Sequence, residues 1–190
     1  MRLLDAYLFP ALWIAFLLLW QFMAANAKTT QQMEPARSRV IRAVLFLVAI
    51  VLLLDPGIPI PWLYRRFVAE SRFNFWGGAT ITLVGLLFSV WARLHLGRNW
   101  SRSVTIKADH ELIMTGPYAL VRHPIYTGLL TAFLGTALAT EEFRGILAFL
   151  LIFVGLWAKL RLEEKWMRGQ FGASYEAYSR RAKALVPFVL

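Results

Sequence analysis

Cysteine is absent from this 190-residue chain. Its absence excludes disulfide bonds, thiolate zinc sites and a cysteine nucleophile. Histidine is scarce as well, and the spacing of His95, His110 and His123 does not match a metal-binding motif. The sequence therefore predicts neither a metal centre nor thiol chemistry.

Two common enzyme motifs are also missing. The chain has no G-x-S-x-G sequence, which would mark the nucleophile turn of a serine hydrolase. It has no G-x-G-x-x-G sequence after a strand, which would mark a Rossmann-type cofactor domain. Any nucleotide-like cofactor must then bind among the helices of the domain itself.

Acidic residues are few, with 11 Asp and Glu against 21 Lys and Arg, for a formal net charge of +10. The cations flank apolar segments and do not form a soluble basic domain. The preference of basic residues for cytoplasmic loops, together with their attraction to anionic lipid, explains these cations better than nucleic-acid binding does. Hydrophobic residues make up 58% of the chain, and mean hydropathy is +0.54. These values predict an all-α integral membrane protein with a single domain.

Apolar segments predict five transmembrane helices. The first is about 20 residues long, which suits a retained span, whereas the last two are short at about 16 residues each. A polar link at 140–144 should join those two into an antiparallel hairpin. Gly77, Gly78 and Gly85 would let a neighbouring helix approach closely. The expected spans are residues 6–25, 40–54, 75–91, 125–140 and 145–160.

Basic residues concentrate after the first span, between the third and fourth spans, and in the C-terminal segment. In a five-span arrangement these regions share one side, so they are expected in the cytoplasm, with the N-terminus outside. Residues 1–92 would hold three spans, and residues 93–190 a catalytic half with the other two. An amphipathic helix is expected over residues 163–181.

Residues 115–128 (TGPYALVRHPIYTG) combine a turn signal with charged groups beside an apolar run. Pro124 favours an extended His123 and a helix that begins at Pro124. The free N–H groups of such a helix start can bind an anion. One alternative is a capped helix start with Arg122 reaching a lipid phosphate. Charged groups at this position favour a functional site.

Three further segments carry polar groups. Lys159 and Glu163 share a helix face, which fits either an interfacial salt bridge or a grip on a charged cofactor and an anionic substrate. Residues 171–178 (FGASYEAY) predict a helix break at Gly172, with Tyr175 and Tyr178 as interfacial anchors. Residues 97–101 (GRNWS) predict a polar turn.

Taken in order, these segments and the final Pro187-Phe188 resemble the isoprenylcysteine carboxyl methyltransferase (ICMT) family of integral membrane methyltransferases. The resemblance covers the chain from about residue 94 to its end. It implies S-adenosyl-L-methionine as methyl donor and a lipophilic acceptor from the bilayer, surrounded by membrane lipid. Phospholipid N-methyltransferases and membrane sterol reductases carry similar C-terminal motifs.

The resemblance also implies site residues. Lys159 stands where the family often has an arginine assigned to the substrate carboxylate; lysine keeps the charge but loses the bidentate fork. The implied catalytic residues are Glu163, Lys159, Asn99 and Arg122. The implied cofactor pocket comprises Ser103, His110, Glu111, Leu112, Ile113, Tyr118, His123, Pro124, Ile125, Tyr126 and Glu163.

The mechanism that this assignment favours is attack of an ionised acceptor, most simply a carboxylate, on the methyl group of the cofactor. Glu163 would orient the charged end of the cofactor, and His123 and Tyr126 would hold its carboxylate or amino group. Lys159 would hold the acceptor anion. The alternatives are N- or S-methylation of a phospholipid or small molecule, an NADPH-dependent sterol-type reductase, and a membrane scaffold without enzymatic activity.

Overall fold

Helices form nearly all of the regular structure in the computed structural model, which describes residues 3–24, 30–54, 57–97, 100, 105–107 and 112–187. The long helices of this part are α1 (Leu3–Ala24), α2 (Ala36–Leu54), α3 (Arg72–Leu96), α5 (Pro124–Thr140) and α6 (Phe143–Phe171). The short elements are β1 (Thr30–Met33), η1 (Pro61–Tyr64), β2 (Thr105–Lys107), α4 (Pro117–Leu120) and α7 (Ala173–Arg181).

The described residues of all five expected apolar segments are helical, which confirms the all-α prediction. The expected helix over residues 163–181 is wrong, because α6 runs on without a break to Phe171. Gly172 then adopts a positive φ of 49° and separates α6 from α7, as the glycine predicted. Among the described residues, α3 and α6 are long and apolar enough to cross a membrane, judged by length and composition alone. Two shorter apolar helical stretches are Tyr7–Met23 and Pro124–Thr140.

Close contact between α3 and α5 depends on glycines in both helices. Gly78 and Gly85 of α3 lie against Gly135 and Gly128 of α5. A Cβ atom on Gly85 would lie 2.5 Å from the carbonyl oxygen of Gly128, so no larger residue fits without movement. The expectation of close approach is thus confirmed for Gly78 and Gly85. It is wrong for Gly77, because nothing lies within 4 Å of a Cβ at that position.

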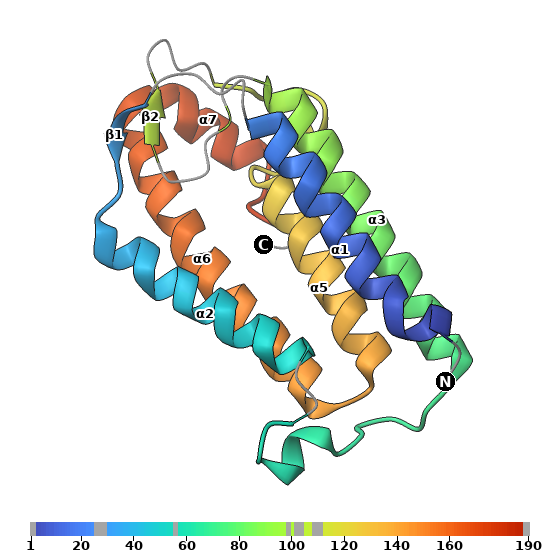
Figure 1. Ribbon diagram of the computed structural model, residues 1–190. Helices are drawn as coiled ribbons and strands as arrows, with labels where there is room; N and C mark the ends of the chain where they lie inside the picture. Colours follow the sequence, from blue (N-terminus) through green and yellow to red (C-terminus); the bar gives the residue numbers. More distant parts are fainter. Residues whose placement is uncertain are drawn as a thin grey trace.

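Hydroxyl groups reinforce this helix pair. Thr82 of α3 donates a hydrogen bond to the carbonyl of Ala132 (3.2 Å), and Ser89 donates to the carbonyl of Ile125 (3.1 Å). The indole of Trp13 in α1 donates to Thr136 (3.2 Å). Helices α1, α3 and α5 therefore form one layer, and α2 lies along α6 in a second layer (Figure 1).

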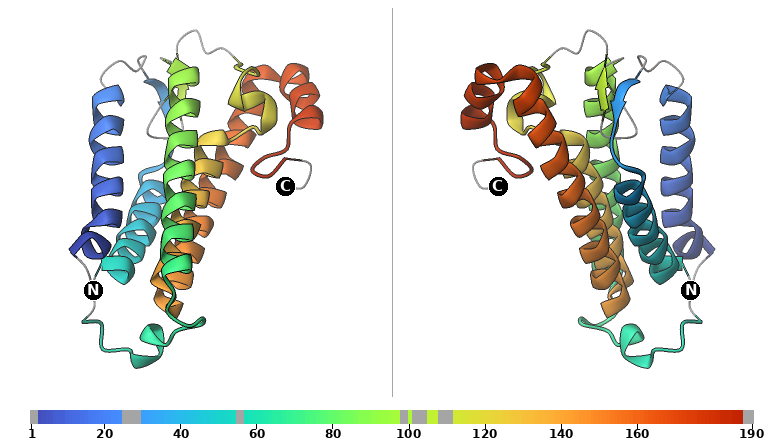
Figure 2. Two further views of the ribbon diagram at one scale, coloured as in Figure 1. Left: turned by 90° about the vertical axis from the view of Figure 1, so that its right-hand side faces the viewer. Right: turned by 90° about the vertical axis from the view of Figure 1, so that its left-hand side faces the viewer.

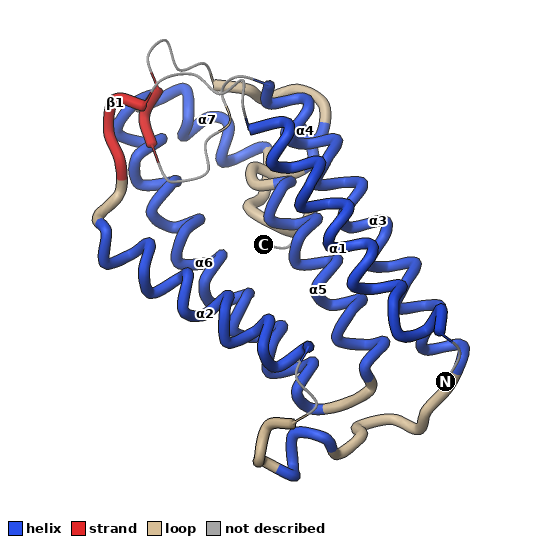
Figure 3. The backbone as a smooth tube through the Cα atoms, in the orientation of Figure 1, coloured by secondary structure: helices blue, strands red, loops and turns tan. Residues whose placement is uncertain are grey.

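The bundle has two different ends (Figure 2). The end that carries β1, β2, α4 and α7 is called the site end here, and the end that carries η1 and residues 140–143 is called the loop end. At the site end, β1 and β2 pair antiparallel, with Thr30 opposite Lys107 and Met33 opposite Thr105. This ribbon joins the α1–α2 connection to the α3–α4 connection (Figure 3).

At the loop end, the predicted hairpin between α5 and α6 is confirmed, and Glu141 forms its tight turn. Glu141 has a left-handed backbone with φ of 58°, and only 3% of its surface is exposed. Its carboxylate accepts hydrogen bonds from the Arg66 guanidinium (2.6 Å) and the Ser71 backbone N–H (2.9 Å). These bonds compensate for the strained backbone and for burial of the charge.

The glycine contact between α3 and α5 can be tested by adding one methyl group. Gly85→Ala is expected to lower the free energy of unfolding by about 1–3 kcal/mol, because its Cβ would overlap the backbone of α5. Gly77→Ala on the same helix is the matched control, and it should be neutral or slightly stabilising because its surroundings are open. Unfolding in detergent measures both. Equal effects at the two positions would contradict the close packing.

Candidate active site

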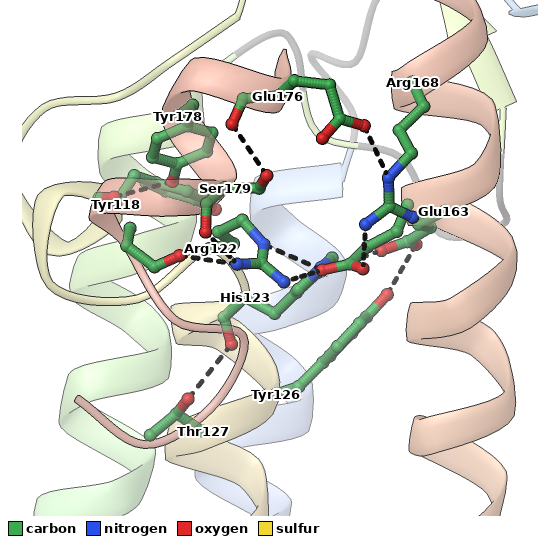
Figure 4. A network of polar contacts seen from close by, with 12 residues as sticks. Tyr118, Arg122, His123, Tyr126, Thr127, Glu163, Arg168, Glu176, Tyr178 and Ser179 are labelled. Atoms are coloured by element: carbon green, nitrogen blue, oxygen red, sulfur yellow. Dashed lines mark hydrogen bonds and ion pairs between the residues drawn. The ribbon is translucent and has the colours of Figure 1, made fainter. Parts of the chain in front are cut away.

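Two pairs of neighbouring residues face each other at the site end: Arg122-His123 before α5 and Glu163-Glu164 on α6. Figure 4 shows Arg122 and His123 pointing toward α6, with Glu163 near them. The Nε of Arg122 donates to Oε1 of Glu164 at 2.8 Å, and its Nη2 also pairs with that oxygen. Nδ1 of His123 lies 3.5 Å from Oε2 of Glu163. Nε2 of the same ring lies 3.5 Å from Oε1 of Glu164, so His123 lies between the two carboxylates and Arg122 pairs with Glu164.

The Arg122 guanidinium is held inside the protein. Its side chain is 11% exposed, and its Nη1 donates to the carbonyls of Ser179 (3.1 Å) and Ala182 (2.5 Å). Glu164 also accepts from Arg168 at 3.2 Å. Arg122 therefore fastens the end of α7 to the start of α5, and in this conformation it does not extend toward a lipid headgroup.

Helix α5 begins at Pro124, as the sequence predicted. The expected extended backbone is wrong for His123, whose φ of −124° and ψ of 60° lie outside the extended region. The segment after α7 lies against this helix start. The backbone N–H of Arg122 donates to Lys183 (2.7 Å), and that of His123 donates to Ala184 (3.0 Å). These two N–H groups are used by carbonyls of the chain itself, which removes them from the anion cradle expected there.

Glu163 lies at the centre of the candidate site. Its Oε1 accepts a hydrogen bond from the Tyr126 hydroxyl at 2.6 Å and lies 3.8 Å from Nζ of Lys159. The rings of His123 and Tyr126 stack with centroids 5.5 Å apart, and the Lys159 ammonium lies 5.4 Å from the centre of the Tyr126 ring. The structure thus brings together four residues that the sequence analysis assigned to one site; their roles remain predictions.

His123 is almost fully buried between two carboxylates. Burial alone would lower the pKa of His123, but hydrogen bonding and the charges of Glu163 and Glu164 outweigh it and raise that pKa. Its Nε2 is buried without a hydrogen-bond partner in the described part of the chain, and Oε1 of Glu164 lies 3.5 Å away. A buried donor of this kind is suited to an incoming acceptor group.

The tyrosines around this cluster act as neutral hydroxyls. Burial raises the pKa of Tyr178 to about 12, and burial together with the Glu163 charge raises the pKa of Tyr118 further above its usual range. Tyr178 donates to the carbonyl of Tyr118 at 2.6 Å. The expectation of interfacial anchoring is wrong for Tyr175 and Tyr178, which are 2% and 6% exposed and pack against Ala182.

A cavity of about 2240 Å³ lies between the two helix layers, with the charged cluster at its site end. Aromatic side chains line much of it, among them Trp13, Trp20, Phe46 and Phe133. Most of the proposed site residues described here line it: Leu112, Ile113, Tyr118, Arg122, His123, Ile125, Tyr126, Lys159 and Glu163. Pro124 is buried at the start of α5. Asn99, Ser103, His110 and Glu111 lie outside the described residues.

Arg42 of α2 also lines this cavity, and the sequence analysis missed it. It is paired with buried Glu34. Arg42 belongs by position to the basic residues that follow the first expected span, but it also falls inside the expected second span at 40–54. An arginine within a span was the signal that could have identified it.

Comparison with known proteins gives the family. A model of the phospholipid methyltransferase (PEMT) family matches residues 73–174, more than half of the chain. The chain belongs to the phospholipid methyltransferase family. The match runs from the start of α3 into α7, so this family region contains both halves of the Arg122-His123 and Glu163-Glu164 arrangement.

Relatives of this phospholipid methyltransferase family member confirm the resemblance that the motifs gave. Protein-S-isoprenylcysteine O-methyltransferase B of Arabidopsis thaliana is 27% identical over 137 residues, covering 70% of this chain and 64% of the relative. The Schizosaccharomyces pombe protein-S-isoprenylcysteine O-methyltransferase is 34% identical over 104 residues, covering 52% of this chain and 43% of the relative. The chain thus spans less than two thirds of these relatives' lengths.

The fold has a solved counterpart. The structure of the eukaryotic intramembrane Ras methyltransferase ICMT matches with a TM-score of 0.56 and 23% sequence identity. The match covers 83% of this chain and 55% of that one. This match shows that the helical arrangement of this chain occurs in a solved structure.

The charge of His123 can be measured directly. Its imidazole resonances should titrate above the usual value of about 6.5, and Glu163→Gln should lower that pKa by removing a neighbouring negative charge. Glu70→Gln, an exposed carboxylate at the loop end, is the control. Because the folded pKa is raised, this charge stabilises the fold fully below about pH 6.5, and the contribution is lost as pH rises through the raised value. Titration at or below the usual value would contradict the assignment.

The Arg122–Glu164 pair should behave as a structural tie. Arg122→Gln would leave Glu164 buried with a weaker partner and is expected to cost about 3–5 kcal/mol of unfolding free energy. It should also expose the segment after α7 to proteases. Arg180→Gln, an exposed arginine on α7, provides the control. A stable Arg122→Gln protein with an intact C-terminal segment would show that Arg122 is not needed to hold it.

Proposed function

We propose that the protein transfers a methyl group from S-adenosyl-L-methionine to a lipophilic acceptor, most simply a carboxylate, giving a methyl ester. The observation that carries this proposal is the cluster of Glu163, His123, Tyr126 and Lys159 at the head of an aromatic-lined cavity. Charged groups and a large apolar space meet there, as a charged cofactor and a lipophilic acceptor require. The names of the relatives support carboxyl methylation of an isoprenylcysteine as the first substrate to test.

The cluster fits the charges of S-adenosylmethionine. That cofactor has a cationic sulfonium, an amino group and a carboxylate, and it supplies an electrophilic methyl group. The Glu163 carboxylate would hold a cationic part, and the buried Nε2 of His123 would donate to the carboxylate. Tyr126 would keep Glu163 oriented through its 2.6 Å hydrogen bond. Tyr118, Leu112, Ile113, Pro124 and Ile125 complete the proposed pocket, together with Ser103, His110 and Glu111.

Lys159 favours an anionic acceptor. A carboxylate is ionised at neutral pH and needs no general base, so positioning and exclusion of water would provide most of the catalysis. The Lys159 ammonium would repel a protonated amine, which argues against N-methylation of an amino headgroup in the same position. Methylation of a phospholipid is nevertheless kept as the second candidate, because the matching family model describes phospholipid methyltransferases.

The proposed topology has five membrane spans formed by α1, α2, α3, α5 and α6, within one domain over residues 1–190. The N-terminus would lie outside, and the site end would face the cytoplasm. The concentration of basic residues on one side of this arrangement supports the orientation. Two of these helices satisfy the length and composition of a span by themselves, and the others would span as part of the bundle.

The role of Glu163 in cofactor binding has a direct test. Glu163→Gln should weaken binding of S-adenosylhomocysteine by about 10-fold, because a charged hydrogen-bonding partner of the amino group is lost. Calorimetry on the purified protein measures the affinity, and Glu70→Gln is the control with the same change of charge at the loop end. Normal binding by Glu163→Gln would exclude this role.

The activity itself is tested by labelled methyl transfer from S-adenosylmethionine. S-farnesylcysteine is the first acceptor, and a total lipid and metabolite extract follows, with identification of the labelled product. A base-labile methyl ester is expected, whereas a labelled amine would favour phospholipid N-methylation. Binding of NADPH in place of S-adenosylhomocysteine would support a reductase. Binding of neither cofactor would support a scaffold.

A further inference from the structure

Arg42 and Glu34 form a buried ion pair that the proposed methyl transfer does not yet use. The Arg42 side chain on α2 is 11% exposed, and the Glu34 side chain is fully buried. Nη2 of Arg42 pairs with Oε1 of Glu34, and Nη1 donates to the Ser38 hydroxyl at 2.9 Å. Both partners hold terminal nitrogens of the guanidinium and so fix its plane.

The bond between Arg42 and Glu34 links residues that are close in the sequence. Glu34 lies just before α2, and Arg42 follows eight residues later, within the second turn of that helix. Arg122 and Glu164, by contrast, are 42 residues apart and join two helices. A buried ion pair is a weak source of stability even when its geometry is good. The place of Arg42 on the cavity wall is where such a pair can also serve binding.

Lys159 lies in the same part of the cavity. Helix α2 runs antiparallel to α6 and lies beside it (Figure 1), and both Arg42 and Lys159 line the cavity. Gly155 of α6 lies against Leu45 and Phe46 of α2. Because the helices are antiparallel, Lys159, one turn further along α6, lies level with Arg42, about one turn earlier in α2. Two cations thus face one space, where each repels the other and an anion would be stabilised by both.

We infer that Arg42 and Lys159 together bind the anionic group of the acceptor, with Glu34 and Ser38 as positioning residues for Arg42. The planar guanidinium supplies the directional hydrogen bonds that an ammonium lacks, and Lys159 supplies a second point charge. This inference rests on the proposed carboxylate acceptor. It assigns part of the recognition of that acceptor to α2, outside the residues that match the family model, and the rest to Lys159 inside them.

The test is equilibrium binding of two probes, S-farnesylcysteine and its carboxamide, to the full-length protein. The wild type should prefer the carboxylate. Arg42→Gln should weaken carboxylate binding by about 10- to 100-fold, the loss expected for a charged hydrogen-bonding pair, and leave carboxamide binding unchanged. The affinity of Arg42→Lys for the carboxylate should lie between those of the wild type and Arg42→Gln. Arg37→Gln removes the same charge from an exposed position on α2 and should bind like the wild type.

Affinity for S-adenosylhomocysteine, measured on the Arg42 and Arg37 variants, shows whether the site is folded and should not change. Lys159→Gln, combined with Arg42→Gln, should show coupling between the two positions. Unchanged carboxylate binding by Arg42→Gln would overturn the inference and leave the proposed methyl transfer standing. A wild type with no preference for the carboxylate would also overturn it. If the wild type prefers the carboxylate through Arg42 but methylates neither probe, the anion site stands and the carboxyl methylation fails.

Discussion

The ion pair between Arg122 and Glu164 is the interaction on which the site depends. Two charges that are this well buried must stay together, because separating them would leave each without compensation. The pair fixes α6 relative to the start of α5. Arg122 is followed by His123, and Glu164 is preceded by Glu163, so a site residue lies next to each partner. Successive residues on a helix point about 100° apart. With Glu164 facing Arg122, Glu163 is turned toward the cavity and His123.

Cofactor and acceptor would share one set of charges under the proposed function. Glu163 is contacted by Tyr126, Lys159 and His123. A cationic group bound at Glu163 would weaken the hold of that carboxylate on Lys159, which would then be drawn more strongly to an acceptor anion. The short distances within this cluster make the two binding events electrostatically dependent on each other.

Local features of the fold could be predicted from the sequence, and contacts between distant segments could not. The helix start at Pro124 and the break at Gly172 follow from backbone preferences of single residues. The shared face of Lys159 and Glu163 follows from helix periodicity. Arg122 donates hydrogen bonds to the carbonyls of Ser179 and Ala182, which lie about 60 residues further along the chain. No spacing rule in the sequence reveals partners at that separation.

The same distinction explains the errors at the site. Gly77 and Gly78 are neighbours in an apolar run, but only Gly78 faces α5, and the sequence does not show which side of α3 is covered. Tyr175 and Tyr178 have the composition of interfacial anchors, yet α7 folds back and buries them. Arg42 lay in a region without recognisable motifs, so its position in the cavity became visible only with the packing of α2 on α6.

The glycine contacts between α3 and α5 mean that the helices around the cavity differ in how much sequence change they tolerate. Backbone packed this closely has almost no tolerance for sequence change, and both helices fall within the family match at residues 73–174. Helices α1 and α2, which contribute one helix to each layer around the cavity, lie outside that match. The proposed chemistry could then be inherited intact while the acceptor is exchanged through α1 and α2. Exchange of those two helices between family members would be a route to redesigned acceptor choice.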